Sequence, residues 1–158
     1  MDRFVYEAQD EAQTAALGRA LADVLPDGTV VALCGPLGAG KTRLVQALAE
    51  ACGVDRRFVT SPSFVLVQEY HGRRVIYHVD AYRLRDPDEF WDLGPDEYFA
   101  SSGLVLVEWA DRVADCLPPD HVVIQVEVTG DRSRRFDLRV QGTRYPGLLA
   151  RLEARLGR

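Results

Sequence analysis

The sequence predicts an α/β fold in which a mainly parallel sheet carries an antiparallel C-terminal hairpin. Apolar and β-branched runs at 29–34 and 104–107 are typical of strands buried on both faces of a parallel sheet. Segments 121–128 and 135–141 instead alternate apolar and polar residues around the turn at 130–131, which indicates two paired antiparallel strands. Amphipathic stretches between the strands predict helices on both faces of the sheet, and hence three layers.

The first third of the chain predicts a strand, a helix and a second strand. The first strand covers residues 3–8, and the helix begins where Asp10 and Gln13 have the spacing of a capping box. A turn at 26–28 ends this helix before the first apolar run, and a second helix begins at Lys41. The remaining elements are predicted as strands at 64–70, 75–80 and 104–108, short helical turns in the acidic segment DPDEFWDLGPDEYF, and a final helix at 145–156.

Length and composition limit the class of protein. A chain of 158 residues fits one domain, residues 1–158, and is long enough to bury a core. No apolar run approaches the roughly 20 residues of a membrane helix, and the N-terminus lacks the apolar core of a signal peptide. We therefore expect a soluble, cytoplasmic protein with no membrane partner.

Cysteine and charge patterns exclude further classes. Three widely spaced cysteines without a C-x-x-C pair argue against a disulfide framework and a zinc site. The net charge of -5 predicts no strong direct binding to nucleic acid. Residues 80–100 hold seven acids and two arginines, whereas 132–158 hold eight arginines and two acids. This asymmetry indicates differently solvated faces or a partner surface.

The stretch GPLGAGKT has the G-x-x-x-x-G-K-[ST] pattern of a phosphate-binding loop, between a predicted strand and a predicted helix. Its glycines let backbone N–H groups converge on phosphate oxygens at a helix N-terminus. Lys41 is the only lysine in the chain, and its compact ammonium suits a position between β- and γ-phosphates better than the wide fork of arginine. Thr42 is expected to give its hydroxyl to Mg²⁺. The residues predicted to bind the nucleotide here are Gly35, Pro36, Leu37, Gly38, Ala39, Gly40, Lys41 and Thr42.

The nucleotide is expected to be ATP. An N-K-x-D segment that reads guanine cannot exist, because the single lysine belongs to the loop. Asp80 and Glu108 each end an apolar strand, where open α/β sheets bind ligands, and either carboxylate suits Mg²⁺ or an attacking water. His78 is predicted to be a hydrogen-bonded strand residue rather than a metal ligand, because Mg²⁺ prefers oxygen. Tyr82 and Trp109 follow the two acids, and they suit either stacking or the core.

Several segments together resemble one family, TsaE, the small P-loop ATPase of bacterial tRNA threonylcarbamoyladenosine synthesis. These segments are GPLGAGKT, SPSFVLVQEY, YHVDAYRL, DPDEFWDLGPDEYF and VEWADR. The resemblance implies a P-loop NTPase-like domain that uses ATP and Mg²⁺. It also implies an ATPase, weak alone, that acts with the TsaB–TsaD complex and supports its repeated turnover.

The resemblance also implies roles for individual residues. Lys41, Asp80 and Glu108 would be catalytic, with Thr42 and Glu108 as Mg²⁺ ligands and Trp109 important in an unspecified role. The segment from Ser61 to Phe64 would be a switch loop that senses the γ-phosphate, although Ser63 replaces the threonine usual in the family. Adenine contacts are predicted near the first helix and the basic hairpin, with Glu11, Thr14 and Arg132 as candidates.

Two other functions use the same loop. A small-molecule kinase would pass the phosphoryl group to a bound acceptor, with arginines such as those at 132–135 covering the site. A nucleotide-dependent binding module would use ATP only to order the 61–63 segment and change its affinity for a partner.

Overall fold

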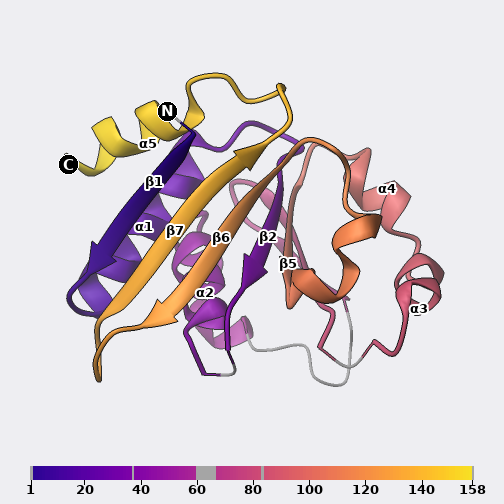
Figure 1. The fold of residues 1–158 in the computed structure, drawn as a ribbon, viewed down its shortest axis with the longest axis horizontal. Coiled ribbons are helices and arrows are strands. Elements are labelled where there is room, and N and C mark those ends of the chain that lie inside the picture. The colour runs from indigo at the N-terminus through magenta and orange to yellow at the C-terminus, as the bar shows by residue number, and fades with distance from the viewer. Residues whose placement is uncertain (1, 37, 60–66, 83, 158) are drawn as a thin grey trace.

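The computed structural model describes residues 2–36, 38–59, 67–82 and 84–157 (Figure 1). Its strands are β1 (Arg3–Ala8), β2 (Val30–Cys34), β3 (Val67–His71), β4 (Val75–Asp80), β5 (Leu104–Glu108), β6 (His121–Val128) and β7 (Arg134–Gln141). Its α-helices are α1 (Glu11–Val24), α2 (Lys41–Ala51), α3 (Pro87–Asp92), α4 (Pro95–Phe99) and α5 (Leu148–Leu156). Two 3-10 segments, η1 (Arg56–Phe58) and η2 (Ala110–Cys116), follow α2 and β5.

The seven strands form one sheet in the order β1-β7-β6-β2-β5-β4-β3. Strands β6, β2, β5 and β4 pair in parallel at its centre. β3 is antiparallel to β4 at one edge, while β7 is antiparallel to β6 and β1 to β7 at the other. β1 therefore points the same way as the central strands. The predicted mainly parallel sheet with an antiparallel C-terminal hairpin, β6–β7, is confirmed.

Alternating side chains of the buried strands divide the core in two. Val31 and Leu33 of β2 pack with residues of α1, α2 and α5 on one face of the sheet. Val30 and Ala32 pack on the other face with residues of α3 and η2. Figure 1 shows α1 and α2 together behind the sheet, with α3 and α4 beyond its β5 side. The three predicted layers follow from this two-residue alternation, because each face needs its own cover.

Most predicted element boundaries agree with the structure, and one helix start was wrong. The Asp10 carboxylate accepts the Gln13 N–H at 2.9 Å, which begins α1 as the capping pattern predicts. The last helix begins at Leu148 instead of residue 145, because Gly147 adopts a left-handed conformation with φ of 72° before the helix starts. The predicted strand at 64–70 continues to His71, and its residues 64–66 lie outside the described ranges. Within those ranges, no helix is long and apolar enough to cross a membrane.

The sheet brings three strand ends together where the phosphate-loop motif begins. In the register of the central strands, Leu33 lies opposite Glu108, and Glu108 lies opposite Asp80. β2 leads directly from this edge into the loop that precedes α2. The two candidate carboxylates therefore stand on neighbouring strands beside the loop.

Candidate functional site

The phosphate-loop motif connects the end of β2 to the first turn of α2. Gly35 has φ of 146° and Gly40 has φ of 105°, conformations that favour glycine. A Cβ atom at Gly35 would lie 2.6 Å from the carbonyl oxygen of Val126, so the neighbouring strand also requires glycine there. Gly40 is the N-cap of α2 and provides no side-chain cap, which leaves the first helical N–H groups available to a ligand. Leu37, predicted to contact the nucleotide, lies outside the described residues.

Gly35→Ala is expected to lower the free energy of unfolding by about 3 kcal/mol, because it adds a steric clash to an unfavourable φ. Gly38→Ala is the matched control. Gly38 also has a positive φ of 77°, but no atom lies within 4 Å of a Cβ added there, so its expected cost is about 1 kcal/mol. Urea unfolding of both variants measures the difference, and equal costs would contradict the close approach to Val126.

Lys41 lies across the loop that precedes it. Its Nζ donates hydrogen bonds to the carbonyl oxygens of Gly35 at 2.6 Å and Pro36 at 2.9 Å. The same ammonium lies 3.8 Å from the centroid of the Trp109 ring, a cation–π contact. Burial lowers the pKa of Lys41, while the carboxylates of Glu108, Asp111 and Asp80 act in the opposite direction. The lysine is thus held by neutral loop and ring groups and attracted by the acids around it.

Glu108 is at the centre of a buried polar chain. Its two carboxylate oxygens each lie 2.9 Å from the Thr42 hydroxyl, which donates to them. Nε2 of His78 lies 2.5 Å from Oε2 of Glu108, and Nδ1 of His78 lies 2.8 Å from the Tyr70 hydroxyl. Burial raises the pKa of Tyr70, with a further contribution from the Glu108 charge, so its hydroxyl keeps its proton. The expected hydrogen-bonded role of His78 agrees with this geometry, and the chain fixes the Glu108 carboxylate beside Thr42.

Asp80 stands beside Glu108 on the neighbouring strand. It is buried, with 6% of its surface exposed, and its Oδ1 accepts the backbone N–H of Tyr82 at 2.9 Å. The centroids of the Tyr82 and Trp109 rings lie 4.8 Å apart with the ring planes tilted by 43°, which brings the two aromatic residues together beside the site. Among the described residues, Trp109 is the one non-glycine residue with a positive φ, 59°. This sparsely populated conformation holds the indole beside Lys41.

Two hollows flank the loop. The first, here called the metal-side hollow, has a volume of about 250 Å³ and is lined by Gly38, Ala39, Gly40, Lys41, Thr42, Arg43, Glu108 and Trp109. The second, the hairpin-side hollow, has about 230 Å³ and is lined by Glu11, Thr14, Gly38, Gly40, Arg43, Asp131, Arg132, Arg134 and Phe136. The structure therefore brings the adenine-contact candidates Glu11, Thr14 and Arg132 to the loop. They come from opposite ends of the chain.

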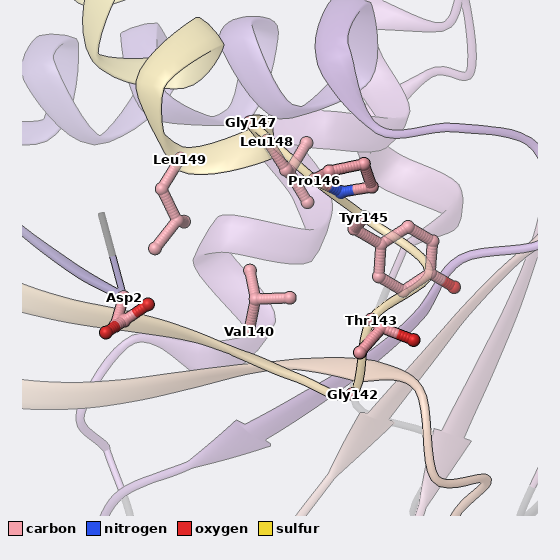
Figure 2. Close-up of a pocket in the computed structure, with 9 residues that line it drawn as sticks. All are labelled: Asp2, Val140, Gly142, Thr143, Tyr145, Pro146, Gly147, Leu148 and Leu149. Atoms are coloured by element: carbon pink, nitrogen blue, oxygen red, sulfur yellow. The ribbon is translucent and has the colours of Figure 1, made fainter.

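A further hollow lies at the other end of the strands from the phosphate loop, at the start of β1, the end of β7 and the start of α5. It has a volume of about 340 Å³, and Figure 2 shows its lining residues, with Asp2 and Val140 facing Leu149. Asp2 is the one charged residue in this lining. None of the predicted site residues lines it, and we assign it no role.

The donor set at Thr42 and Glu108 fits Mg²⁺. A hydroxyl and a carboxylate supply the oxygen ligands that this ion prefers, and the ion usually completes its shell with phosphate and water oxygens. Within the described ranges, no group of three or more His, Cys, Asp or Glu side chains is arranged to hold a metal.

Some predicted residues cannot be assessed, and others were missed. Ser61 and Ser63, the proposed switch residues, lie outside the described residues. Sequence reasoning considered Arg134 only among the arginines at 132–135 that could cover a kinase site, and missed that its Nε donates to the Ala39 carbonyl oxygen at 2.9 Å and links the hairpin to the loop. It also missed Arg43, although an arginine directly after a G-K-T motif is a cation at a phosphate site, which is a usable signal.

Comparisons with known proteins agree on one family. The family model described as "Threonylcarbamoyl adenosine biosynthesis protein TsaE" matches residues 8–136. A tRNA threonylcarbamoyladenosine biosynthesis protein TsaE from Treponema pallidum is 42% identical over 129 residues, covering 82% of this chain and 93% of that protein. A protein of the same name from Bacillus subtilis is 37% identical over 153 residues, covering 96% and 95%. The crystal structure of B. subtilis YdiB has a TM-score of 0.79 and 32% identity, covering 96% of this chain and 95% of that chain.

Proposed function

The chain belongs to the TsaE family, and from this membership we propose that it is a Mg²⁺-dependent ATPase required for threonylcarbamoyladenosine modification of tRNA. In this proposal the ATPase is weak alone and acts with the TsaB–TsaD complex. The observation that carries the ATPase assignment is the convergence of Lys41, Thr42 and Glu108 at one phosphate loop, with Asp80 on the next strand.

The two hollows support one proposed orientation of the nucleotide. The phosphates bind along the loop N–H groups and Lys41, and the adenosine extends into the hairpin-side hollow toward Glu11 and Arg132. Lys41 then exchanges its contacts with the carbonyl oxygens of Gly35 and Pro36 for phosphate oxygens. Because these carbonyls are neutral acceptors, the exchange gives the ammonium a charged partner in a buried site.

Thr42 and Glu108 are proposed to hold Mg²⁺, and His78 keeps Glu108 oriented through its contact at 2.5 Å. An ion held by these two residues would supply positive charge close to the terminal phosphate oxygens. Asp80, whose Oδ1 is fixed by the Tyr82 N–H, orients the attacking water and accepts its proton. Ser61 and Ser63 are retained as proposed γ-phosphate sensors.

A reconstituted tRNA modification reaction tests this function. The TsaB–TsaD complex is supplied with its substrates and ATP, and modified adenosines are counted per complex with this chain, without it, or with Lys41→Ala. We expect repeated turnover only with the wild-type chain. Equal numbers of modified adenosines per complex in all three reactions would contradict the proposal. Transfer of the γ-phosphoryl group to a small acceptor would instead favour the alternative function, a small-molecule kinase.

A further inference from the structure

Arg43 follows the phosphate loop directly, in the first turn of α2, and part of its guanidinium group has no partner. Its Nε and Nη1 atoms are buried, and neither forms a hydrogen bond. Buried donors in proteins are nearly always paired with protein, water or ligand, and a cation requires this pairing more than a neutral group does. These donors have no partner within the protein and are therefore available to a ligand, and the positive charge of the guanidinium favours an anionic one.

Arg43 also lies where the two hollows meet. Gly38, Gly40 and Arg43 line both the metal-side hollow and the hairpin-side hollow. Two of these three residues are glycines, so the wall that the two hollows share has one side chain, that of Arg43. A ligand that extends from one hollow into the other along this shared wall would lie beside Arg43.

Arg134 also lines the hairpin-side hollow, but its Nε and Nη1 donors already have partners within the protein. Nε of Arg134 donates to the Ala39 carbonyl oxygen at 2.9 Å, and its Nη1 donates to the carbonyl oxygens of Gly130 at 3.0 Å and Ser133 at 2.8 Å. Through these contacts Arg134 links the β6–β7 hairpin to the phosphate loop. Arg43 has no comparable contacts through Nε and Nη1, which makes it the better candidate to bind an anion.

We propose that Arg43 binds the α-phosphate of ATP or ADP and thereby contributes to nucleotide affinity. The inference rests on the proposed function, which puts the adenosine in the hairpin-side hollow and the terminal phosphates at Lys41 and Thr42. With those two ends fixed, the α-phosphate is the anionic group at the shared wall. Guanidinium offers paired donors that match two oxygens of one phosphate, which an ammonium cannot do.

Titration calorimetry with ATP and with ADP at one ionic strength tests the inference on the full chain. Arg43→Gln is expected to weaken both nucleotides by the same factor, about 10-fold, because both carry the α-phosphate and a charge-assisted contact is lost. Arg43→Lys is expected to fall between the wild type and Arg43→Gln, because it keeps the charge without the fork. Arg56→Gln is the matched control, since Arg56 is an exposed arginine in η1; its affinities should equal those of the wild type.

Three results would overturn this inference and leave the proposed function standing. The first is wild-type affinity for both nucleotides in a folded Arg43→Gln variant. The second is weaker binding of ATP with unchanged binding of ADP, which would put Arg43 at a terminal phosphate. Unchanged nucleotide affinity with weaker binding to TsaB–TsaD would assign the unpaired donors to a partner carboxylate instead. A folded wild-type chain that binds neither nucleotide would overturn the proposed function as well. Thermal unfolding of each variant checks that it is folded.

Discussion

Replacing Lys41 by arginine is expected to reduce ATP hydrolysis almost as far as replacing it by alanine, by about 100-fold or more. The ammonium fits a small space, with Nζ 2.6 Å from the Gly35 oxygen, 2.9 Å from the Pro36 oxygen and 3.8 Å from the Trp109 ring centroid. The residue is only 4% exposed. Arginine keeps the charge but replaces the compact ammonium with a wide planar fork, so it cannot reproduce the position of Nζ in this buried site.

Steady-state phosphate release by the wild type, Lys41→Arg and Lys41→Ala measures this effect. Arg56→Lys is the matched control, because it exchanges the same two side chains in the reverse direction at an exposed position. Thermal unfolding distinguishes a lost contact from a misfolded chain. Near-wild-type hydrolysis by Lys41→Arg would show that any cation suffices, and would remove the reason we give for the single lysine.

Glu108→Gln is expected to lower hydrolysis by about 100-fold or more and to abolish the dependence of nucleotide affinity on Mg²⁺. The amide keeps the size of the side chain, so it can still contact Thr42 and His78, but it removes the negative charge that favours the metal. Nucleotide affinity measured without Mg²⁺ should be retained. This combination separates loss of a metal ligand from loss of the binding site.

Asp80→Asn is compared with Glu108→Gln, because Asp80 lies opposite Glu108 in the strand register. We expect it to lower kcat while the Mg²⁺ dependence of nucleotide affinity remains, since its proposed role is to orient water. Calorimetry with and without Mg²⁺, together with phosphate release, compares the two variants. Unchanged hydrolysis in both, with altered association with TsaB–TsaD, would instead favour a nucleotide-dependent binding module.

Local patterns predicted much of the fold. β4, β5 and β6 begin and end at the residues that their patterns indicate. β5 is buried on both faces and is apolar up to Glu108, whereas β6 alternates because its two faces differ in burial. The start of α1 follows from the Asp10 cap. The start of α5 did not follow, because the predicted helix included Tyr145, Pro146 and Gly147, and the left-handed Gly147 delays the helix to Leu148.

The site was predicted as separate residues and not as an arrangement. The motif indicated Lys41 and Thr42, but the sequence could not rank Asp80 and Glu108, because their roles depend on strand order. Since β5 lies directly beside β2, Glu108 reaches the Thr42 hydroxyl. The contact of Arg134 with Ala39 joins residues 95 positions apart, and no local pattern indicates it.

The most direct test of the central claim is Mg²⁺-dependent phosphate release from ATP by the purified chain, with and without TsaB–TsaD, using Lys41→Ala as the blank. The account predicts weak release by the chain alone and faster release when the complex is added. Release that is the same with and without TsaB–TsaD would contradict the claim that this ATPase is coupled to its partners.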